Sequence, residues 1–433
     1  MNGADRSLRR SVSRRTVLAG AGLGALGALT GCARGTLTRP APSGVITLNN
    51  DNTTWEPGFQ AASDVLAERV GLELQIRANP NTSNYQQVVR MSALTDATTD
   101  VFKWWNGYRL HELVHGGILT DLSSAWDRAE QEGWVDPELR DSFSEDGVPY
   151  GIPLYRSYFA MFYSKALFEE HGLEPPETFS ELLEIAHTLR DAGVTPIAST
   201  GAGSWQSLIW FQQLLAGLDP DFYEALTEGE ASYTDPIAEE AMDLWAEMYS
   251  DELFSAPDME ESGVDVQIAD GTMGMTLAGT WMANEFRGSG IESSEVGVFQ
   301  VPTVDPGAEQ SIFVESGALC VPANAHKSEE ALMVAEEWLA TEVQQSWVDF
   351  LADASPNPEA IPDDSVVADF AEGIQQEPPR QLIRYWEASP PALIEGNVQD
   401  LSSFMVTPTE SNARSVLRSM QERAEREWGV WTG

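Results

Sequence analysis

Short apolar runs of strand type alternate with amphipathic runs of helical length along most of this 433-residue chain. Residues 45–48 and 72–76 have the composition of strands, and apolar side chains recur at helical spacing between them, over residues 59–70. A chain that alternates strands and helices in this way covers its sheets with helices. The pattern therefore predicts an α/β fold, and a length of this order predicts two or three structural units, at roughly 100–200 residues per domain.

Further elements continue the alternation. Strands are predicted at residues 100–102, 161–163 and 195–198. Helices are predicted at residues 85–94, 179–192, 205–215, 237–249, 329–351 and 413–428. Thr178 and Glu181 have the spacing of a capping box, which marks the start of the second of these helices.

The chain is strongly acidic, with 68 Asp and Glu against 25 Lys and Arg and a formal net charge of -43 at pH 7. Nucleic-acid binding needs Lys and Arg to neutralise phosphates. Attachment of a protein surface to anionic lipid needs a basic face. The composition excludes both modes of binding.

The first 32 residues have the organisation of an export signal. Arg14 and Arg15 precede an apolar run over residues 17–29, which is shorter than the roughly 20 residues that span a bilayer. Residues 13–18 resemble a twin-arginine export signal. A general secretion signal that contains two adjacent arginines by chance is the alternative.

The tetrapeptide Leu-Thr-Gly-Cys that ends at Cys32 resembles a bacterial lipobox. It predicts acylation of Cys32, a lipid anchor on the outer face of the cytoplasmic membrane, and a tether over residues 33–44. The other thiol, Cys320, lies in an apolar run and is expected to be buried and inert. With Cys32 acylated, no disulfide can form within the chain.

Five blocks of local sequence occur in the order found in extracellular solute-binding proteins of ABC sugar importers. The blocks are residues 147–154, 161–179, 271–281, 315–347 and 380–395, and the last of them resembles the C-terminal binding-site helix of that family. The first reads GVPYGIPL, and the third reads GTMGMTLAGTW, with the glycine, methionine and tryptophan spacing of that family. The chain is identified as a member of family 1 of the extracellular solute-binding proteins, and it is similar to the maltose-binding and multiple-sugar-binding lipoproteins of that family.

The resemblance implies two α/β lobes of the periplasmic-binding-protein type II fold. The implied hinge crossovers lie near residues 153–154, 312–316 and 355–358. The implied N-terminal lobe is residues 45–153 plus 316–354, and the implied C-terminal lobe is residues 154–315 plus 355–433. A ligand would lie in the cleft, and the lobes would close around it by hinge motion. The resemblance also implies a monomer that has no cofactor and no catalytic activity, and that delivers a mono- or oligosaccharide to an ABC permease.

Sugar recognition needs aromatic faces for the C–H side of a pyranose ring and fixed hydrogen-bonding groups for its hydroxyls. The chain has 14 Trp. Trp281 directly follows Gly279 and Thr280 and is expected at a helix N-terminus. The candidate ligand-binding residues, assigned through the resemblance, are Trp55, Trp105, Tyr108, Tyr155, Arg156, Trp205, Trp281, Glu315 and Trp386.

One position departs from the family. Many members have a polar or acidic residue that reads sugar hydroxyls just after the first crossover, where this chain has Tyr155, Arg156 and Ser157. An arginine in the cleft could pair with a carboxylate. An acidic sugar therefore stays open as the ligand.

Two other functions stay open. His111, Glu112 and His115 match the pattern H-E-x-x-H, in which two histidines on one helix face bind zinc and the glutamate acts as a general base. Gly116 and Gly117 are expected to end that helix directly after the second histidine. A secreted zinc hydrolase is therefore the less favoured alternative. The other is a binding lipoprotein for a solute that is not a sugar.

Overall fold

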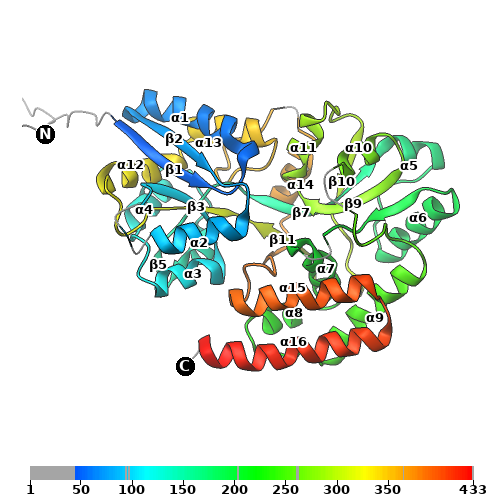
Figure 1. The fold of residues 1–433 in the computed structure, drawn as a ribbon. Helices are drawn as coiled ribbons and strands as arrows, with labels where there is room; N and C mark the ends of the chain where they lie inside the picture. The colour runs from blue at the N-terminus through cyan, green and yellow to red at the C-terminus, as the bar shows by residue number, and fades with distance from the viewer. Residues whose placement is uncertain are drawn as a thin grey trace, which may run out of the picture. The chain divides into compact units, whose positions relative to one another are not determined.

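Two mixed β-sheets, one in each of two lobes, form the framework of the protein (Figure 1). The computed structural model describes residues 44–92, 95, 98–201, 204–259, 263–363 and 365–431. These residues belong to one compact unit. The expected export signal, Cys32 and the tether up to residue 43 lie outside the described residues. Within the described ranges, every helix is too short or too polar to cross a bilayer.

The sheet of the first lobe has the strand order β2-β1-β3-β12-β6. Its strands are β1 (Gly44–Asn50), β2 (Leu72–Ala78), β3 (Val101–Trp105), β6 (Ile152–Pro153) and β12 (Gly317–Cys320). β1 lies parallel to β2 and β3, whereas β12 lies antiparallel to β3 and β6. β12 comes far later in the chain than its neighbours, so this sheet is complete only when a distant segment returns to it.

Helices cover the first sheet, with α1 and α13 packed together above it and α2 below it in Figure 1. The elements are η1 (Thr53–Trp55), α1 (Glu56–Val70), α2 (Thr82–Ser92), α3 (Gly107–His115), α4 (Ser123–Glu132), η2 (Pro137–Phe143), β4 (Ser144–Glu145), β5 (Val148–Pro149), α12 (Ser328–Trp338) and α13 (Thr341–Leu351). Phe59, Ala62 and Leu66 on α1 are fully buried. The apolar periodicity over residues 59–70 therefore predicted the buried face of α1 correctly.

The prediction of a single helix over residues 329–351 is wrong, because the structure has two helices there. α12 ends at Trp338 and α13 begins at Thr341. Between them Ala340 has an extended backbone, with φ of -58° and ψ of 140°. No glycine or proline marks this break, so apolar periodicity alone could not locate it.

The sheet of the second lobe has the strand order β13-β11-β7-β9-β8, with β10 also paired to β7. Its strands are β7 (Ser157–Ser164), β8 (Thr195–Ala198), β9 (Met273–Gly279), β10 (Val296–Phe299), β11 (Ser311–Glu315) and β13 (Arg380–Ile383). β7 is antiparallel to β9, β10 and β11, and β8 is parallel to β9. All seven described residues of β9 are buried, so this strand runs through the core of the lobe.

The second lobe is rich in helices, and α15 and α16 lie side by side along its lower edge in Figure 1. The elements are α5 (Lys165–His171), α6 (Phe179–Asp191), η3 (Trp205–Leu208), α7 (Ile209–Leu218), α8 (Pro220–Thr227), α9 (Pro236–Ser250), α10 (Val264–Ala269), α11 (Met282–Gly288), α14 (Ala368–Gln376), α15 (Pro391–Val406) and α16 (Glu410–Trp431). The capping box predicted for α6 is confirmed. Thr178 Oγ1 accepts from the Glu181 amide at 3.2 Å, and Glu181 Oε2 accepts from the Thr178 amide at 3.0 Å.

The helix that the resemblance implied over residues 380–395 does not form. Residues 380–383 pair with β11 as strand β13, and α15 begins only at Pro391. The residue before a proline is disfavoured in the helical conformation, and Ser389 and Pro390 each precede a proline. Trp386 therefore lies in a loop rather than on a helix.

The chain passes between the lobes where strands of the two sheets follow each other closely. β6 of the first sheet is followed by β7 of the second after residues 154–156, and only Ser316 separates β11 from β12. A third connection follows α13. Arg156 and Ala354 form an isolated antiparallel bridge, so the first and third connections are paired.

Asp353 lies fully buried where these connections meet. Its Oδ1 accepts from Thr280 Oγ1 at 2.5 Å and from the Ala354 amide at 2.8 Å, and Ser157 donates to its Oδ2. Burial raises the pKa of Asp353 to about 7, and these hydrogen bonds offset only part of that effect. The neutral acid is therefore favoured in the folded protein at pH values where the unfolded chain is ionised.

Replacing Asp353 by Asn should remove a pH dependence of stability. The folded pKa lies above the usual value, so the folded protein holds a proton that the unfolded chain has lost between about pH 4 and 7. The wild-type free energy of unfolding should therefore fall relative to Asp353→Asn as pH rises through this interval, by at most about 4 kcal/mol. Calorimetric melting between pH 4 and 8 measures the difference. If the free energies of unfolding of the two proteins changed in parallel with pH, the raised pKa of Asp353 would be contradicted.

Candidate functional site

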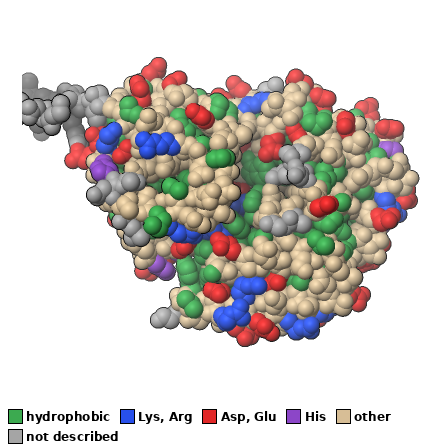
Figure 2. Space-filling view, viewed as in Figure 1, with side chains coloured by type: hydrophobic (Ala, Val, Ile, Leu, Met, Phe, Trp, Pro, Cys, Tyr) green, Lys and Arg blue, Asp and Glu red, His purple; other side chains and the backbone are tan. Residues whose placement is uncertain are grey.

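A cavity of about 250 Å³ opens between the two lobes, near the lower end of the range of small-molecule sites. The space-filling view shows a hollow between the lobes with hydrophobic side chains along it (Figure 2). The lining residues before β7 are Asp51, Asn52, Thr54, Trp55, Thr82, Lys103, Trp105 and Tyr155. Those after it are Trp205, Trp281, Asn284, Glu285, Glu315, Arg384 and Trp386.

The carboxyl ends of strands bring most of these side chains to the cavity. β1 ends at Asn50, so Asp51 and its neighbours follow directly, and β3 ends with Trp105. In the second lobe β9 ends at Gly279, and Trp281 is the N-cap residue of α11. Ligands of α/β sheets bind at the carboxyl ends of strands, and here two sheets direct such ends at one cavity.

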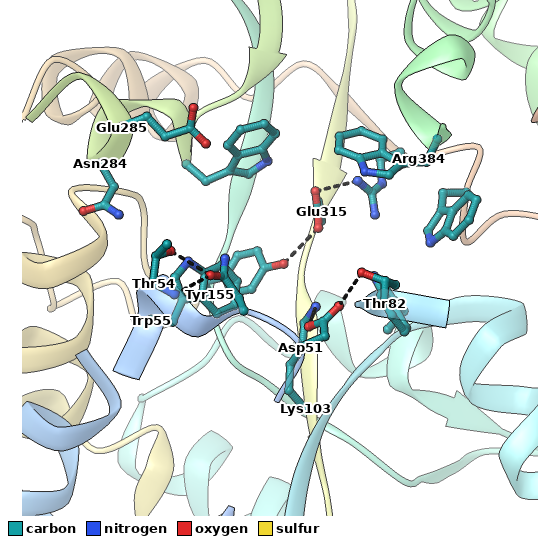
Figure 3. Close-up of a pocket in the computed structure, with 15 residues that line it drawn as sticks. Asp51, Thr54, Trp55, Thr82, Lys103, Tyr155, Asn284, Glu285, Glu315 and Arg384 are labelled. Atoms are coloured by element: carbon teal, nitrogen blue, oxygen red, sulfur yellow. Dashed lines mark hydrogen bonds and ion pairs between the residues drawn. The ribbon is translucent and has the colours of Figure 1, made fainter. Parts of the chain in front are cut away.

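Aromatic rings from both lobes form the walls. Trp55 meets Tyr155 edge to face, with ring centroids 5.3 Å apart and planes at 81°. Trp205 meets Trp281 in the same manner, at 6.3 Å and 71°. In Figure 3, Asn284 and Glu285 lie above Trp55 and Tyr155. Such contacts between rings hold each ring in place before a ligand arrives.

Lys103 is the cation of the first-lobe wall, and its charge is already paired. Its Nζ lies 2.8 Å from Asp51 Oδ1 and 4.4 Å from the ring centroid of Trp105. Thr82 Oγ1 donates to the second oxygen of Asp51 at 3.3 Å (Figure 3). The side chains of Lys103 and Asp51 are each 7% exposed, so this is a buried ion pair rather than a free positive charge.

Arg384 is the cation of the second-lobe wall, and two carboxylates hold it. Its Nη1 lies 2.8 Å from Glu315 Oε2, and its Nε donates to Glu387 Oε2 at 2.8 Å. Burial lowers the pKa of Arg384, but the attraction of Glu315 and Glu387 outweighs burial and leaves the pKa above its ordinary value. Tyr155 Oη donates to Glu315 Oε1 at 2.9 Å (Figure 3). Burial and the same carboxylate raise the pKa of Tyr155 well above its ordinary value, so its hydroxyl keeps its proton.

The structure brings together seven of the nine residues expected in the cleft. They are Trp55, Trp105, Tyr155, Trp205, Trp281, Glu315 and Trp386. Tyr108 lies elsewhere, with its ring 5.4 Å from those of Trp428 and Trp431 on α16. Arg156 also lies outside the lining, and its Nη2 donates to Gln381 Oε1 at 2.6 Å.

Eight polar or charged lining residues were not anticipated from the sequence. They are Asp51, Asn52, Thr54, Thr82, Lys103, Asn284, Glu285 and Arg384. Lys103 carried a signal, because a lysine between Phe102 and Trp104 interrupts an otherwise apolar strand. Arg384 had no comparable signal, because its partners come from β11 and from its own loop.

Each side chain of the H-E-x-x-H pattern is engaged with another part of the first lobe. His111 Nδ1 and His115 Nε2 both lie 2.9 Å from oxygens of Glu145. Glu112 forms an ion pair with Arg90, at 2.7 Å between Oε2 and Nη2. The described residues contain no group of three or more His, Cys, Asp or Glu placed to hold a metal ion.

Comparison with known proteins gives one family. The family model described as "Bacterial extracellular solute-binding protein" matches residues 50–352. An "Uncharacterized ABC transporter extracellular-binding protein" of Pyrococcus horikoshii is 24% identical over 266 residues, which cover 58% of this chain and 57% of the relative. A "Probable sugar-binding periplasmic protein" of Brucella melitensis is 26% identical over 198 residues, 44% of this chain and 45% of the relative. The matches thus span less than two thirds of the length of these relatives.

A solved structure shows the same fold over nearly the whole chain. The bacterial solute receptor AcbH, described as having an exclusive preference for β-D-galactopyranose, superposes with a TM-score of 0.77. The superposition covers 89% of this chain and 99% of the receptor, at 16% sequence identity. At this identity the likeness shows the fold alone, which is the two-lobed α/β fold expected from the sequence.

Removing the guanidinium of Arg384 should destabilise the protein strongly. Arg384→Ala would leave Glu315 and Glu387 buried without their partner, which costs about 3–5 kcal/mol for pairs of this kind. Arg380→Ala is the matched control, because Arg380 on the same segment pairs with exposed carboxylates and should cost less than about 1 kcal/mol. Urea denaturation at pH 7 measures both losses. Equal losses of stability in the two variants would show that the pairs of Arg384 with Glu315 and Glu387 do not stabilise the site.

Proposed function

Because the chain belongs to the bacterial extracellular solute-binding protein family, we propose that it captures a neutral mono- or oligosaccharide and delivers it to an ABC permease. Members of this family bind solutes and do not transform them, so the chain is not an enzyme. One observation carries the choice of a sugar. The cavity between the lobes is walled by indoles from both sides, and its two cations are each held by a carboxylate.

The indoles suit the apolar side of a sugar ring. A pyranose presents C–H groups on one face, and flat aromatic rings cover such a face at low entropic cost. The five lining tryptophans are Trp55, Trp105, Trp205, Trp281 and Trp386. Polar groups between them, such as Asn52, Asn284 and Thr54, can exchange hydrogen bonds with hydroxyls and thereby discriminate between sugars.

The charges of the cavity favour a neutral ligand over an acidic one. Arg156, which could have received a sugar carboxylate, lies outside the lining. Lys103 and Arg384 already have carboxylate partners at 2.8 Å. The lining also contains more acidic than basic side chains, namely Asp51, Glu285 and Glu315 against Lys103 and Arg384. An anionic ligand would therefore meet net repulsion.

Capture would require the lobes to move about their connections. We propose that the moving bodies are residues 45–153 plus 316–354 and residues 154–315 plus 355–433. β11 belongs to the sheet of the second lobe and β12 to the sheet of the first lobe, which supports a division near Ser316. A ligand that contacts both lobes stabilises the closed arrangement, because only that arrangement supplies both sets of contacts. We expect the protein to work as a monomer.

The names of similar proteins agree with this proposal. One relative is called sugar-binding, and the similar receptor is described as preferring a pyranose. A non-sugar solute is the alternative ligand. The sequence of residues 13–32 further supports export by the twin-arginine route, or by general secretion, and a lipid anchor on Cys32.

Trp281→Ala should weaken binding of the cognate saccharide by about 2–4 kcal/mol, the range of a buried aromatic anchor. Trp281 lines the cavity together with Asn284, and its ring contacts that of Trp205. Trp134→Ala is the control, because Trp134 is also half-buried but lies beside Arg69 and Arg128, outside the lining. Thermal stabilisation by a panel of sugars and other solutes identifies the ligand, and isothermal calorimetry then measures affinity. Stabilisation by a non-sugar solute alone would refute the sugar proposal, and an unchanged affinity would remove Trp281 from the site.

Cys32→Ala should release the protein from the membrane. A diacylated thiol gives stable anchoring, and loss of the thiol removes the attachment point of the lipid. Cell fractionation followed by immunoblotting should find the wild type with membranes and the variant in the soluble extracytoplasmic fraction. Cys320→Ala is the control, since Cys320 is fully buried in the first lobe and should leave the distribution unchanged. Membrane association of Cys32→Ala would contradict the lipid anchor.

A further inference from the structure

Arg109 lies outside the cavity lining but contacts two of the rings that form it. The residue belongs to α3 of the first lobe and has no exposed surface. Its guanidinium carbon lies 3.6 Å from the ring centroid of Trp386 and 5.8 Å from that of Trp105. At 3.6 Å, the guanidinium covers one face of the Trp386 indole directly.

The polar contacts of Arg109 are few for a buried charge. Nε donates to the backbone oxygen of Trp386 at 3.1 Å, and Nη1 lies 3.5 Å from a carboxylate oxygen of Glu395. Neither Nη nitrogen has a hydrogen-bond partner within the part of the chain that the structure describes. A buried guanidinium with unmet N–H groups is costly, so packing alone does not explain an arginine here. Besides the contact with Glu395, its guanidinium has two close contacts with Trp386, one with the indole ring and one with the backbone oxygen.

The start of α3 is pressed against the loop that carries Trp386. The Tyr108 amide donates to the backbone oxygen of Glu387 at 2.9 Å. Gly107 has a φ of +56°, and a Cβ at this position would lie 2.5 Å from that same oxygen, so the close approach requires glycine. Trp386 packs against the hydrophobic clusters of both lobes. A segment of the second lobe is thus docked on the first lobe at the edge of the cavity.

We infer that Arg109 is a positioning residue for ligand binding, which holds one face of Trp386 so that the rest of the ring stays in the cavity wall. The inference rests on the proposed function. Arg109 does not reach the ligand itself, because it is fully buried beneath the ring. Because Arg109 comes from the first lobe and Trp386 from the second, the stack places the ring relative to both lobes at once.

Fluorine NMR on protein labelled with 5-fluorotryptophan tests the stack without any ligand. The Trp386 resonance is assigned as the signal missing from Trp386→Phe. Arg109→Lys keeps the charge but loses the planar stack, so the Trp386 resonance should shift or broaden. Arg90→Lys is the matched control, because Arg90 lies 5.8 Å from Trp104, a buried ring outside the lining. It should leave the Trp386 resonance in place.

Calorimetry with the saccharide that best stabilises the wild type then tests the effect on binding. Arg109→Lys should lower affinity at least tenfold, and Arg90→Lys should leave it unchanged. If Arg109 acts through the ring, Arg109→Lys combined with Trp386→Ala should bind no more weakly than Trp386→Ala alone. If Arg109→Lys does not fold, the NMR and calorimetry measurements are made on Arg109→Met instead.

An unmoved Trp386 resonance in the Arg109 variants, or losses of affinity that multiply in the double variant, would overturn the positioning role. Failure of the wild type to bind any saccharide would instead contradict the proposed function. The resonance is read without ligand, so the two failures are distinguishable.

Discussion

The buried ion pair between Glu315 and Arg384 is the interaction on which the rest of the site depends. Glu315 is the last residue of β11, and directly after Ser316 the chain enters β12 in the sheet of the other lobe. The same carboxylate accepts the Tyr155 hydroxyl from the first connection between the lobes. Buried charges are stable only while their partners stay in place. The pair therefore fixes the connection between β11 and β12, the ring of Tyr155 and the wall that contains Arg384 relative to each other.

A binding site built across two lobes follows from this arrangement. The connections carry polar anchors, Glu315 on one and Asp353 on another, while indoles from both lobes supply the contact surface. Neither lobe alone completes the walls. Under the proposed function, a ligand that contacts both lobes would gain most when the lobes are closed, and it would leave unchanged when they open. Fixed rings reduce the entropy that binding must overcome, which is the physical reason for contacts such as that of Arg109 with Trp386.

Local patterns predicted the fold better than the polar part of the site. The apolar face of α1 and the capping box at Thr178 are short-range features, and both were readable from the chain. The break between α12 and α13 was not readable, because only the backbone of Ala340 marks it. Aromatic residues after strands indicated the cavity walls, as with Trp281. Arg384 could not be placed, because its role arises from Glu315, a residue distant in sequence.

A crystal structure of the protein with its stabilising saccharide would show where the sugar lies relative to the two lobes. We expect one intact saccharide between the lobes, in contact with Trp55 or Tyr155 on one side and with Trp281 on the other. We also expect the Lys103–Asp51 and Arg384–Glu315 ion pairs to remain formed when the sugar is bound. A saccharide bound to one lobe only, or outside the cavity with no indole against its ring, would contradict the account.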